Sequence, residues 1–402
     1  MQKKLLAVAV AGALAVPVIA AAQSSVTISG RVTYEYGFAD QGDGRENVDY
    51  ADTPGGSNVR FAGQEALGGG MTAWFQCETS ADIRGIDQVG LCSRNSAVGF
   101  RGGFGNIYAG RWDTPFKRAV NHGTVGAEET GILGTSFLGF GGSGGASAAQ
   151  PAAETQQRQR WKRRETCIIT YDTPNFGGFQ VMGGFTCGNT PADQGLVDGQ
   201  PNQKPRVLSL GGQYVAGPLA IGLGYEEHKE FGTNVPGAAE LDDKGYGVGI
   251  SYGFMNGNLL VGFNYLRREW ETGTVGGIAG TETKKDTFGI GVDWRLAGPH
   301  QLQFQYQWAN DSKGNGGTIG GNGGANGCGV LINGTIGCND TGAEQFSIAY
   351  QYHFSKRTTI KLGYTKTDND SRSNAVRVGN TASLLNFGEN VDSYGFLVKH
   401  NF

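Results

Sequence analysis

The feature that most constrains this chain is a two-residue alternation of apolar side chains with small or polar ones. It is clearest over residues 219–226, 246–254, 288–295, 302–308 and 346–354. In residues 246–254 every second residue is Tyr, Val, Ile or Phe, and the residues between them are Gly or Ser. Because the side chains of a strand point alternately to two faces, this pattern predicts strands with one apolar face each.

The apolar faces are rich in aromatic residues, and these gather near the strand ends, as at Trp294, Tyr352 and Phe354. Aromatic girdles around an apolar outer band, with a polar interior, are typical of membrane β-barrels. Lipid offers no hydrogen-bond partner to an open sheet edge, so such a sheet has to close on itself. The pattern therefore favours a closed barrel over a soluble sandwich.

The connections between these segments alternate between short and long. Short turns are predicted at residues 68–70, 103–105, 175–178, 217–218, 255–257, 298–299 and 355–357. Long polar or glycine-rich segments lie near residues 40–57, 82–93, 117–164, 188–206, 231–244, 271–286, 310–344 and 368–392. Seven short turns and eight long loops predict an all-β fold, a 16-stranded antiparallel transmembrane β-barrel with both termini on the short-turn side. A barrel of that size leaves an aqueous channel.

The first 22 residues predict export. Residues 1–4 include Lys3 and Lys4, residues 5–19 are apolar, and three alanines precede Gln23. This is the layout of a cleaved signal peptide, and the alternative, a single anchoring helix, would be short for a bilayer. We therefore expect a signal peptide at 1–22 and a barrel at 23–402. Loss of the two lysines changes the net charge from −3 to −5, so we expect no nucleic-acid partner.

Several short motifs resemble those of the general porins of beta-proteobacteria and Neisseria. They are residues 25–31 (SVTISGR), 64–71 (QEALGGGM), 98–105 (VGFRGGFG), 110–115 (GRWDTP), 171–178 (YDTPNFGG), 352–358 (YHFSKRT) and 399–402 (KHNF). The resemblance spans nearly the whole mature chain.

This resemblance implies an outer-membrane homotrimer that works as a water-filled channel for passive diffusion of small hydrophilic solutes and ions. It implies contact with outer-membrane lipid and lipopolysaccharide, and it makes Phe402 the signal read by the barrel-assembly machinery. It also implies that the third external loop folds into the lumen and narrows it.

The third long segment, roughly Lys117 to Arg164, is the longest, and a structureless loop of that length in a compact protein is either functional or disordered. It contains Glu128 and Glu129, then an apolar stretch at residues 132–140 that we expect to pack against the wall, and a basic cluster at residues 158–164. We expect a constriction loop here, with Glu128 and Glu129 as its acidic side. The alternative is that these two are ordinary loop charges, because loops are generally polar.

In the porin family, loop carboxylates face a ladder of wall arginines, which orients polar solutes by a transverse field. Matching motif to motif, the candidates are Arg60, Arg111 and Arg164, and Arg163 is an alternative to Arg164. Alternation independently points Arg60 and Arg101 inward, and for Arg111 it is ambiguous. The basic wall predicts mild anion preference. The alternative is that each of these is an ordinary solvated lumen residue.

Six cysteines form three local pairs, which we predict to be disulfides in an exported chain: Cys77–Cys92, Cys167–Cys187 and Cys328–Cys338. Cys167 and Cys187 flank a short turn, and the register that pairs them also pairs Ile169 with Phe185 on the apolar face. The porin pattern generally lacks these cysteines, so nothing about binding by the external loops follows from the resemblance.

The sequence predicts neither enzymatic activity nor a cofactor. It contains no Cys-x-x-Cys-His haem motif, and Ser347 and His353, six residues apart on one predicted strand, lie too far apart to hydrogen-bond as a nucleophile and its base. Asp368, Asn369 and Asp370 alone cannot assemble a calcium site, so no metal is assigned. Two other functions stay open: a solute-selective channel or receptor built on the disulfide-tied loops, and a barrel that sheathes a separate cytochrome.

Overall fold

A computed structural model of the chain describes residues 25–40, 48–53, 56–85, 90–126, 161–187, 206–230, 242–271, 274–275, 278–279, 282–314, 330–332, 335–371, 373 and 388–402. The signal-peptide residues 1–22 lie outside the described residues.

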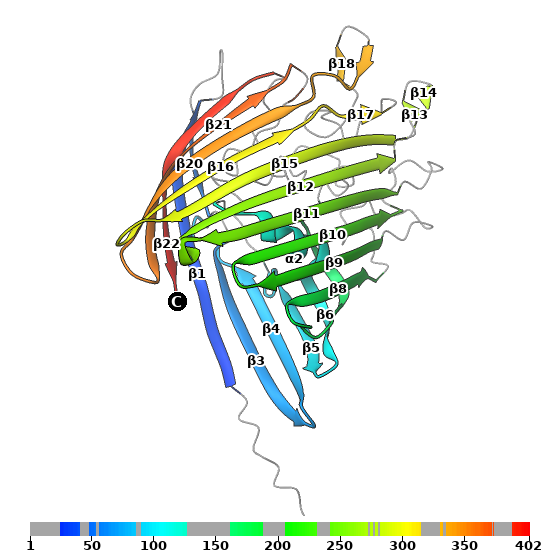
Figure 1. Cartoon of the computed structure of the whole chain (residues 1–402), viewed down its shortest axis with the longest axis vertical. Helices are drawn as coiled ribbons and strands as arrows, with labels where there is room; N and C mark the ends of the chain where they lie inside the picture. The colour runs from blue at the N-terminus through cyan, green and yellow to red at the C-terminus, as the bar shows by residue number, and fades with distance from the viewer. Residues whose placement is uncertain are drawn as a thin grey trace, which may run out of the picture.

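Sixteen long strands form one antiparallel sheet in which each strand pairs with the next along the chain (Figure 1). The first pairs with the last, from Arg31 opposite Asn401 to Asp40 opposite Asp392, and this closes the ring. The predicted 16-stranded barrel is therefore confirmed. The strands are β1 (Ser25–Asp40), β3 (Asn58–Gly68), β4 (Met71–Ser80), β5 (Ser96–Gly102), β6 (Gly105–Asp113), β7 (Arg164–Asp172), β8 (Phe179–Thr186), β9 (Arg206–Ala216), β10 (Leu219–Lys229), β11 (Asp243–Phe254), β12 (Leu259–Glu271), β15 (Glu282–Arg295), β16 (His300–Ala309), β20 (Ala343–His353), β21 (Thr358–Asn369) and β22 (Val391–Asn401).

Short elements add to this frame. The strand β2 (Val48–Asp52) pairs with the second half of β1, beyond the part that β3 covers, so it extends β3 after a break. The strand β17 (Lys313–Gly314) pairs with β15 beyond the end of β16. Two small hairpins lie within long connections, and a 3-10 turn, η2 (Met255–Gly257), joins β11 to β12. The hairpins are β13 (Thr274–Val275) with β14 (Ile278–Ala279), and β18 (Val330–Ile332) with β19 (Thr335–Gly337).

All seven predicted short turns join consecutive strands, and the long connections join the other ends. At the turn between β3 and β4, Gly69 and Gly70 have φ of 59° and 78°, a region that L side chains rarely adopt. Ser25, the first described residue, and Phe402 lie on the short-turn side, where Gly30 and Phe402 exchange two backbone hydrogen bonds of 3.0 Å. The alternation of loop lengths read from the sequence is therefore confirmed.

The two faces of the sheet differ in chemistry as predicted. Apolar side chains such as Ile28, Val98 and Leu223 are more than half exposed on the outer face. Their neighbours in the alternation point inward, and many of these are polar, as with Gln303, Gln305 and Gln307 on β16. No helix among the described residues is long and apolar enough to cross a membrane.

Candidate channel lumen and constriction

The third long connection turns into the barrel directly after β6. Helix α2 (Pro115–Val120) and the 3-10 turn η1 (Asn121–Gly123) follow β6 and contact β9, β10 and β11. The side chain of Thr114 caps the helix by accepting a bond from the Lys117 N–H at 3.3 Å, and Pro115 occupies the first helical position. The N–H of Phe116 donates to Ser209 Oγ on β9 at 2.9 Å. Figure 1 shows α2 within the ring of strands.

This segment packs against a row of inward-facing glycines on β9, β10, β11, β12 and β15, which we call the glycine track. A Cβ at Gly211, Gly222, Gly249, Gly262 or Gly291 would lie under 3.0 Å from the chain between Pro115 and Val125. Gly222 faces Gly249 across β10 and β11, and Gly262 faces Gly291 across β12 and β15. Backbone can approach a sheet this closely only where side chains are missing. The glycines alternating with apolar residues on these strands thus form the seat of α2 and η1, which the sequence analysis did not recognise.

Polar contacts fix the helix to the wall. Arg118 donates to both carboxylate oxygens of Asp172 on β7, at 2.8 and 2.9 Å, and to the hydroxyl of Tyr108 on β6 at 2.8 Å. A bidentate pair of this kind sets orientation as well as adding stability. On the other side, a nitrogen of His122 lies 2.9 Å from Gln213 Oε1 on β9. Hydrogen bonds from Arg118 to β6 and β7, and between His122 and β9, therefore hold the described start of the loop against the wall.

An apolar cluster lies inside the barrel: Phe116, Val120, Trp161, Leu266 and Trp270. Leu266 and Trp270 are inward positions of β12, where the alternation would allow polar residues. Trp161, at the returning end of the loop, stacks on His228 of β10 with ring centroids 4.1 Å apart. The neighbouring Lys162 donates to Thr124 Oγ1 at 3.1 Å, so the two described ends of the loop meet.

The expected acidic side of the constriction, Glu128 and Glu129, lies outside the described residues, as does the apolar stretch 132–140. The connection runs from Thr114, after β6, to Arg163, before β7, so it begins three residues earlier than the sequence indicated.

Arg60 and Arg164 lie on the wall of one hollow of about 530 Å³, together with Arg31, Arg94, Glu78 and Asp113. Arg164 donates to Asn95 Oδ1 at 2.5 Å and pairs with Asp113 at 3.2 Å. Arg94 pairs with Glu78 at 2.5 Å. Arg60 donates to Ser29 Oγ at 3.2 Å, and neither Arg60 nor Arg31 forms an ion pair with any residue that the structure describes.

Arg163 and Arg164, the two alternatives for one position of the ladder, differ in burial. Arg163 is 5% exposed and forms an ion pair with Glu165, whereas Arg164 lines the hollow. Sequence reasoning missed Arg31 and Arg94. Arg31 alternates with the outward Val26 and Ile28, so that signal was present. Arg94 lies in a connection, where alternation gives no direction.

Arg101 and Arg111 do not join this hollow. Arg101 points inward, as predicted, but lines a second hollow nearer the β5–β6 turn. Arg111 shares its alternation with Ile107 and Ala109, both exposed on the outer face. It lies at an irregularity between Gly110 and Trp112, where the pairing of β6 with β7 shifts. The structure thus places Arg111 opposite to the side that the motif match indicated.

Two of the predicted disulfides are present. Cys77 is bonded to Cys92, and Cys167 is bonded to Cys187. The register expected for the second pair is observed, because Ile169 lies opposite Phe185. Cys338 is also disulfide-bonded, but its expected partner Cys328 lies outside the described residues. Among the described residues, no three His, Cys, Asp or Glu side chains are grouped as a metal site.

Comparisons with known proteins agree with this architecture. The family model described as Gram-negative porin matches residues 7–372. Outer membrane porin protein 32 of Delftia acidovorans is 27% identical over 419 residues, covering 100% of both chains. Two solved structures share the fold. The anion-selective porin from Comamonas acidovorans has a TM-score of 0.67 at 21% identity, over 94% of this chain and 100% of that one. The trimer form of OmpT from Vibrio cholerae has a TM-score of 0.61 at 14% identity, over 94% and 99%.

A closed sixteen-stranded barrel with an apolar outer face and a polar lumen, matched over most of its length by this family model, is an outer-membrane diffusion channel and not an enzyme. The chain belongs to the Gram-negative porin family.

Proposed function

We propose that the channel passes small hydrophilic solutes and ions with a preference for anions. The observation that carries this is the hollow around Arg60 and Arg164, whose described wall holds four arginines and two acidic side chains. Fixed positive charge on a narrow wall attracts anions and repels cations. The structurally similar porin from Comamonas acidovorans is named as anion-selective, and this supports the same sign.

Two of the guanidinium groups in this hollow, those of Arg60 and Arg164, extend from strands of the sheet. Arg60 extends from β3 and Arg164 from the first residue of β7. Each is oriented by a hydrogen bond to a neighbouring side chain, Ser29 for Arg60 and Asn95 for Arg164. Charges in fixed positions act on a passing ion without the cost of reorganising first. We infer that this hollow is one wall of the narrow part of the pore.

The test is the reversal potential of the channel in a planar bilayer under a KCl gradient. Wild-type protein should show a reversal potential of the sign that a channel more permeable to chloride than to potassium gives. The double variant Arg60→Gln, Arg164→Gln removes two of the four positive charges, so the ratio of chloride to potassium permeability should fall by roughly a factor of two or more. The matched control is Arg111→Gln, which removes the same charge from the outer side of the wall and should leave the ratio unchanged.

A wild-type channel that prefers potassium would contradict this proposal, as would a double variant whose permeability ratio equals that of wild type. The conductance of the same preparations tests the channel itself, independently of its selectivity.

We further propose that the chain works as a homotrimer in contact with outer-membrane lipid and lipopolysaccharide, after removal of residues 1–22. The trimer form of OmpT supports the assembly, and the wide apolar outer face supports the lipid contact. We also propose that Phe402, which is 44% exposed at the end of β22, is the signal for the barrel-assembly machinery. Native mass spectrometry of the purified protein in detergent should give three copies, and a monomer would contradict the assembly.

A further inference from the structure

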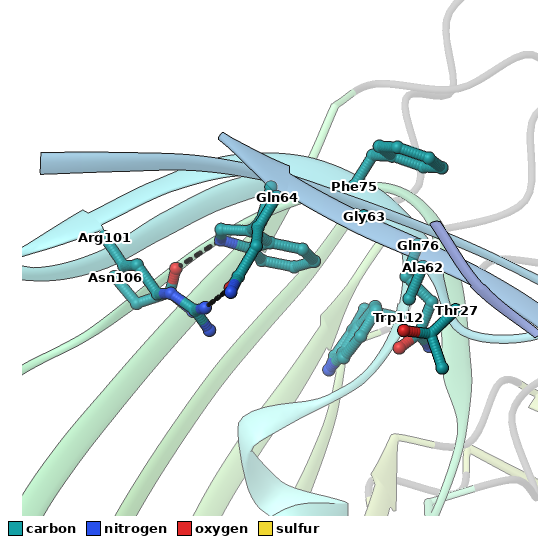
Figure 2. A pocket seen from close by; sticks show the side chains of 10 residues that line it. Thr27, Ala62, Gly63, Gln64, Phe75, Gln76, Arg101, Asn106 and Trp112 are labelled. Carbon is teal, nitrogen blue, oxygen red and sulfur yellow. Dashed lines mark hydrogen bonds between the residues drawn. The ribbon is translucent and has the colours of Figure 1, made fainter. Parts of the chain in front are cut away.

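An aromatic cluster lies on the inner wall, where porin lumens are otherwise polar. Trp74 of β4 and Tyr108 and Trp112 of β6 have ring centroids 5.3 to 5.8 Å apart, and two of the three pairs meet edge to face. Trp74 alternates with Phe75, which is exposed on the outer face. Figure 2 shows the side chain of Phe75 on the opposite side of the sheet from Trp112 and Gln64. Two indole rings therefore lie beside the path of permeating solutes.

These rings are held in place by hydrogen bonds. The indole N–H of Trp74 donates to Asn106 Oδ1 at 2.8 Å. The hydroxyl of Tyr108 accepts from Arg118 of α2 at 2.8 Å, which ties the cluster to the constriction loop. Trp74 and Trp112 are half-buried, whereas Tyr108 is buried beneath them. The arrangement is a rigid apolar surface that offers parts of two indole rings to the lumen.

A hollow of about 450 Å³ adjoins this surface, and Trp74, Trp112, Gln64, Gln76, Asn106 and Arg101 line it. Arg101 is the one charged side chain among the described residues of its wall. Its guanidinium donates to Gln64 Oε1, a bond drawn in Figure 2, and it forms no ion pair with any described residue. The described wall thus combines an aromatic surface, three carboxamides and one positive charge without a compensating carboxylate.

We propose that this hollow is a transient binding subsite for aromatic carboxylates. The ring of such a solute would pack on Trp74 and Trp112, in the offset or edge-to-face arrangements that aromatic pairs prefer. Its carboxylate would pair with Arg101, whose planar guanidinium fits a carboxylate with two hydrogen bonds. A sugar is less well matched, since its hydroxyl donors favour carboxylate acceptors and the described wall has none. The inference goes beyond anion preference, because it selects among anions of equal charge by the shape of their apolar part.

The experiment compares benzoate with cyclohexanecarboxylate, which has the same charge and a similar size but no aromatic ring. In planar bilayers with wild-type protein, benzoate should reduce the open-channel KCl current at concentrations roughly threefold to tenfold lower than cyclohexanecarboxylate does. Trp112→Leu should remove that difference between the two acids. Arg101→Gln should remove the difference between benzoate and uncharged benzamide. Phe100→Leu on the outer face and Arg357→Gln in the β20–β21 turn are matched controls that should behave as wild type.

A second readout does not depend on conduction. Benzoate added to the protein in detergent should change tryptophan fluorescence at concentrations below those needed for cyclohexanecarboxylate, and Trp112→Leu should abolish the difference. Equal effects of the two acids on wild-type protein would overturn the proposal. So would unchanged benzoate block in both Trp112→Leu and Arg101→Gln, when both variants run as folded barrels in unheated gels. A loss of anion preference with this discrimination intact would contradict only the selectivity proposal.

Discussion

At the scale of single residues, the glycines beneath α2 give the sharpest expectation. A side chain at Gly222 would collide with the carbonyl oxygen of Ala119, which is backbone and cannot rotate away. Gly222→Val should therefore lift α2 from the wall into the lumen. We expect a lower single-channel conductance and a free energy of unfolding reduced by about 1–3 kcal/mol, the usual cost of overpacking. Conductance steps and thermal unfolding measure the two effects.

Gly212→Val is the matched control, because a Cβ at Gly212 meets nothing within 4 Å. It adds the same side chain to the neighbouring strand and should leave conductance unchanged. If both variants conduct as wild type does, the glycine track does not seat the helix.

Alternation in the sequence predicted the direction of individual side chains well where the strand ladder is regular. Arg60 and Arg101 point inward as expected, since β3, β4 and β5 keep their register around them. Arg111 follows the alternation of β6, in phase with the outward Ile107 and Ala109, and not the side that its motif indicated.

At the scale of elements, the link between α2 and the wall can be measured as a coupling. Arg118 and Asp172 form a bidentate pair in which Asp172 is largely buried. Arg118→Gln or Asp172→Asn alone should lower the free energy of unfolding by about 2 kcal/mol, because either change leaves a partner unsatisfied. The double variant should lose clearly less than the sum of the two. Each single variant should also show noisier open-channel current, as α2 loses one of its attachments.

The exposed pair Lys366–Asp368 on β21, joined at 3.0 Å, is the control cycle. Exposed ion pairs contribute little, so this cycle should show no measurable coupling. Strictly additive effects for Arg118 and Asp172 would mean that this pair does not help to hold the helix.

The start of α2 is marked by a local signal in the sequence. Thr114 followed by Pro115 is a typical helix start, and both residues lie in the motif at 110–115. The strands were easier to predict, since the alternation recurs along the chain and each repeat supports the others. The apolar contact of Trp161 with His228 and Phe116 could not be foreseen, because it joins residues far apart in the chain. The two hollows on the wall could not be predicted for the same reason, since each is lined by side chains from several strands.

At the scale of the whole molecule, the number of connections in the sequence predicts the barrel. Seven short and eight long connections define sixteen strands, and lipid requires that the sheet has no open edge. The closing pair, β1 with β22, joins the two ends of the chain, so no connecting loop enforces it. The last residue, Phe402, therefore combines two roles, one in the closed ring and one proposed in assembly.

These roles can be separated because they use different atoms of Phe402. Ring closure uses its backbone, which exchanges two hydrogen bonds of 3.0 Å with Gly30. The proposed signal uses the aromatic side chain.

Phe402→Ala keeps the backbone bonds, so purified protein should refold into detergent micelles with the yield and melting temperature of wild type. In cells, the same variant should give several-fold less heat-modifiable barrel in the outer membrane. Phe354→Ala, which removes another exposed phenylalanine ring at the β20–β21 turn, should assemble normally. Equal loss in cells and in vitro would show instead that the ring of Phe402 matters for stability.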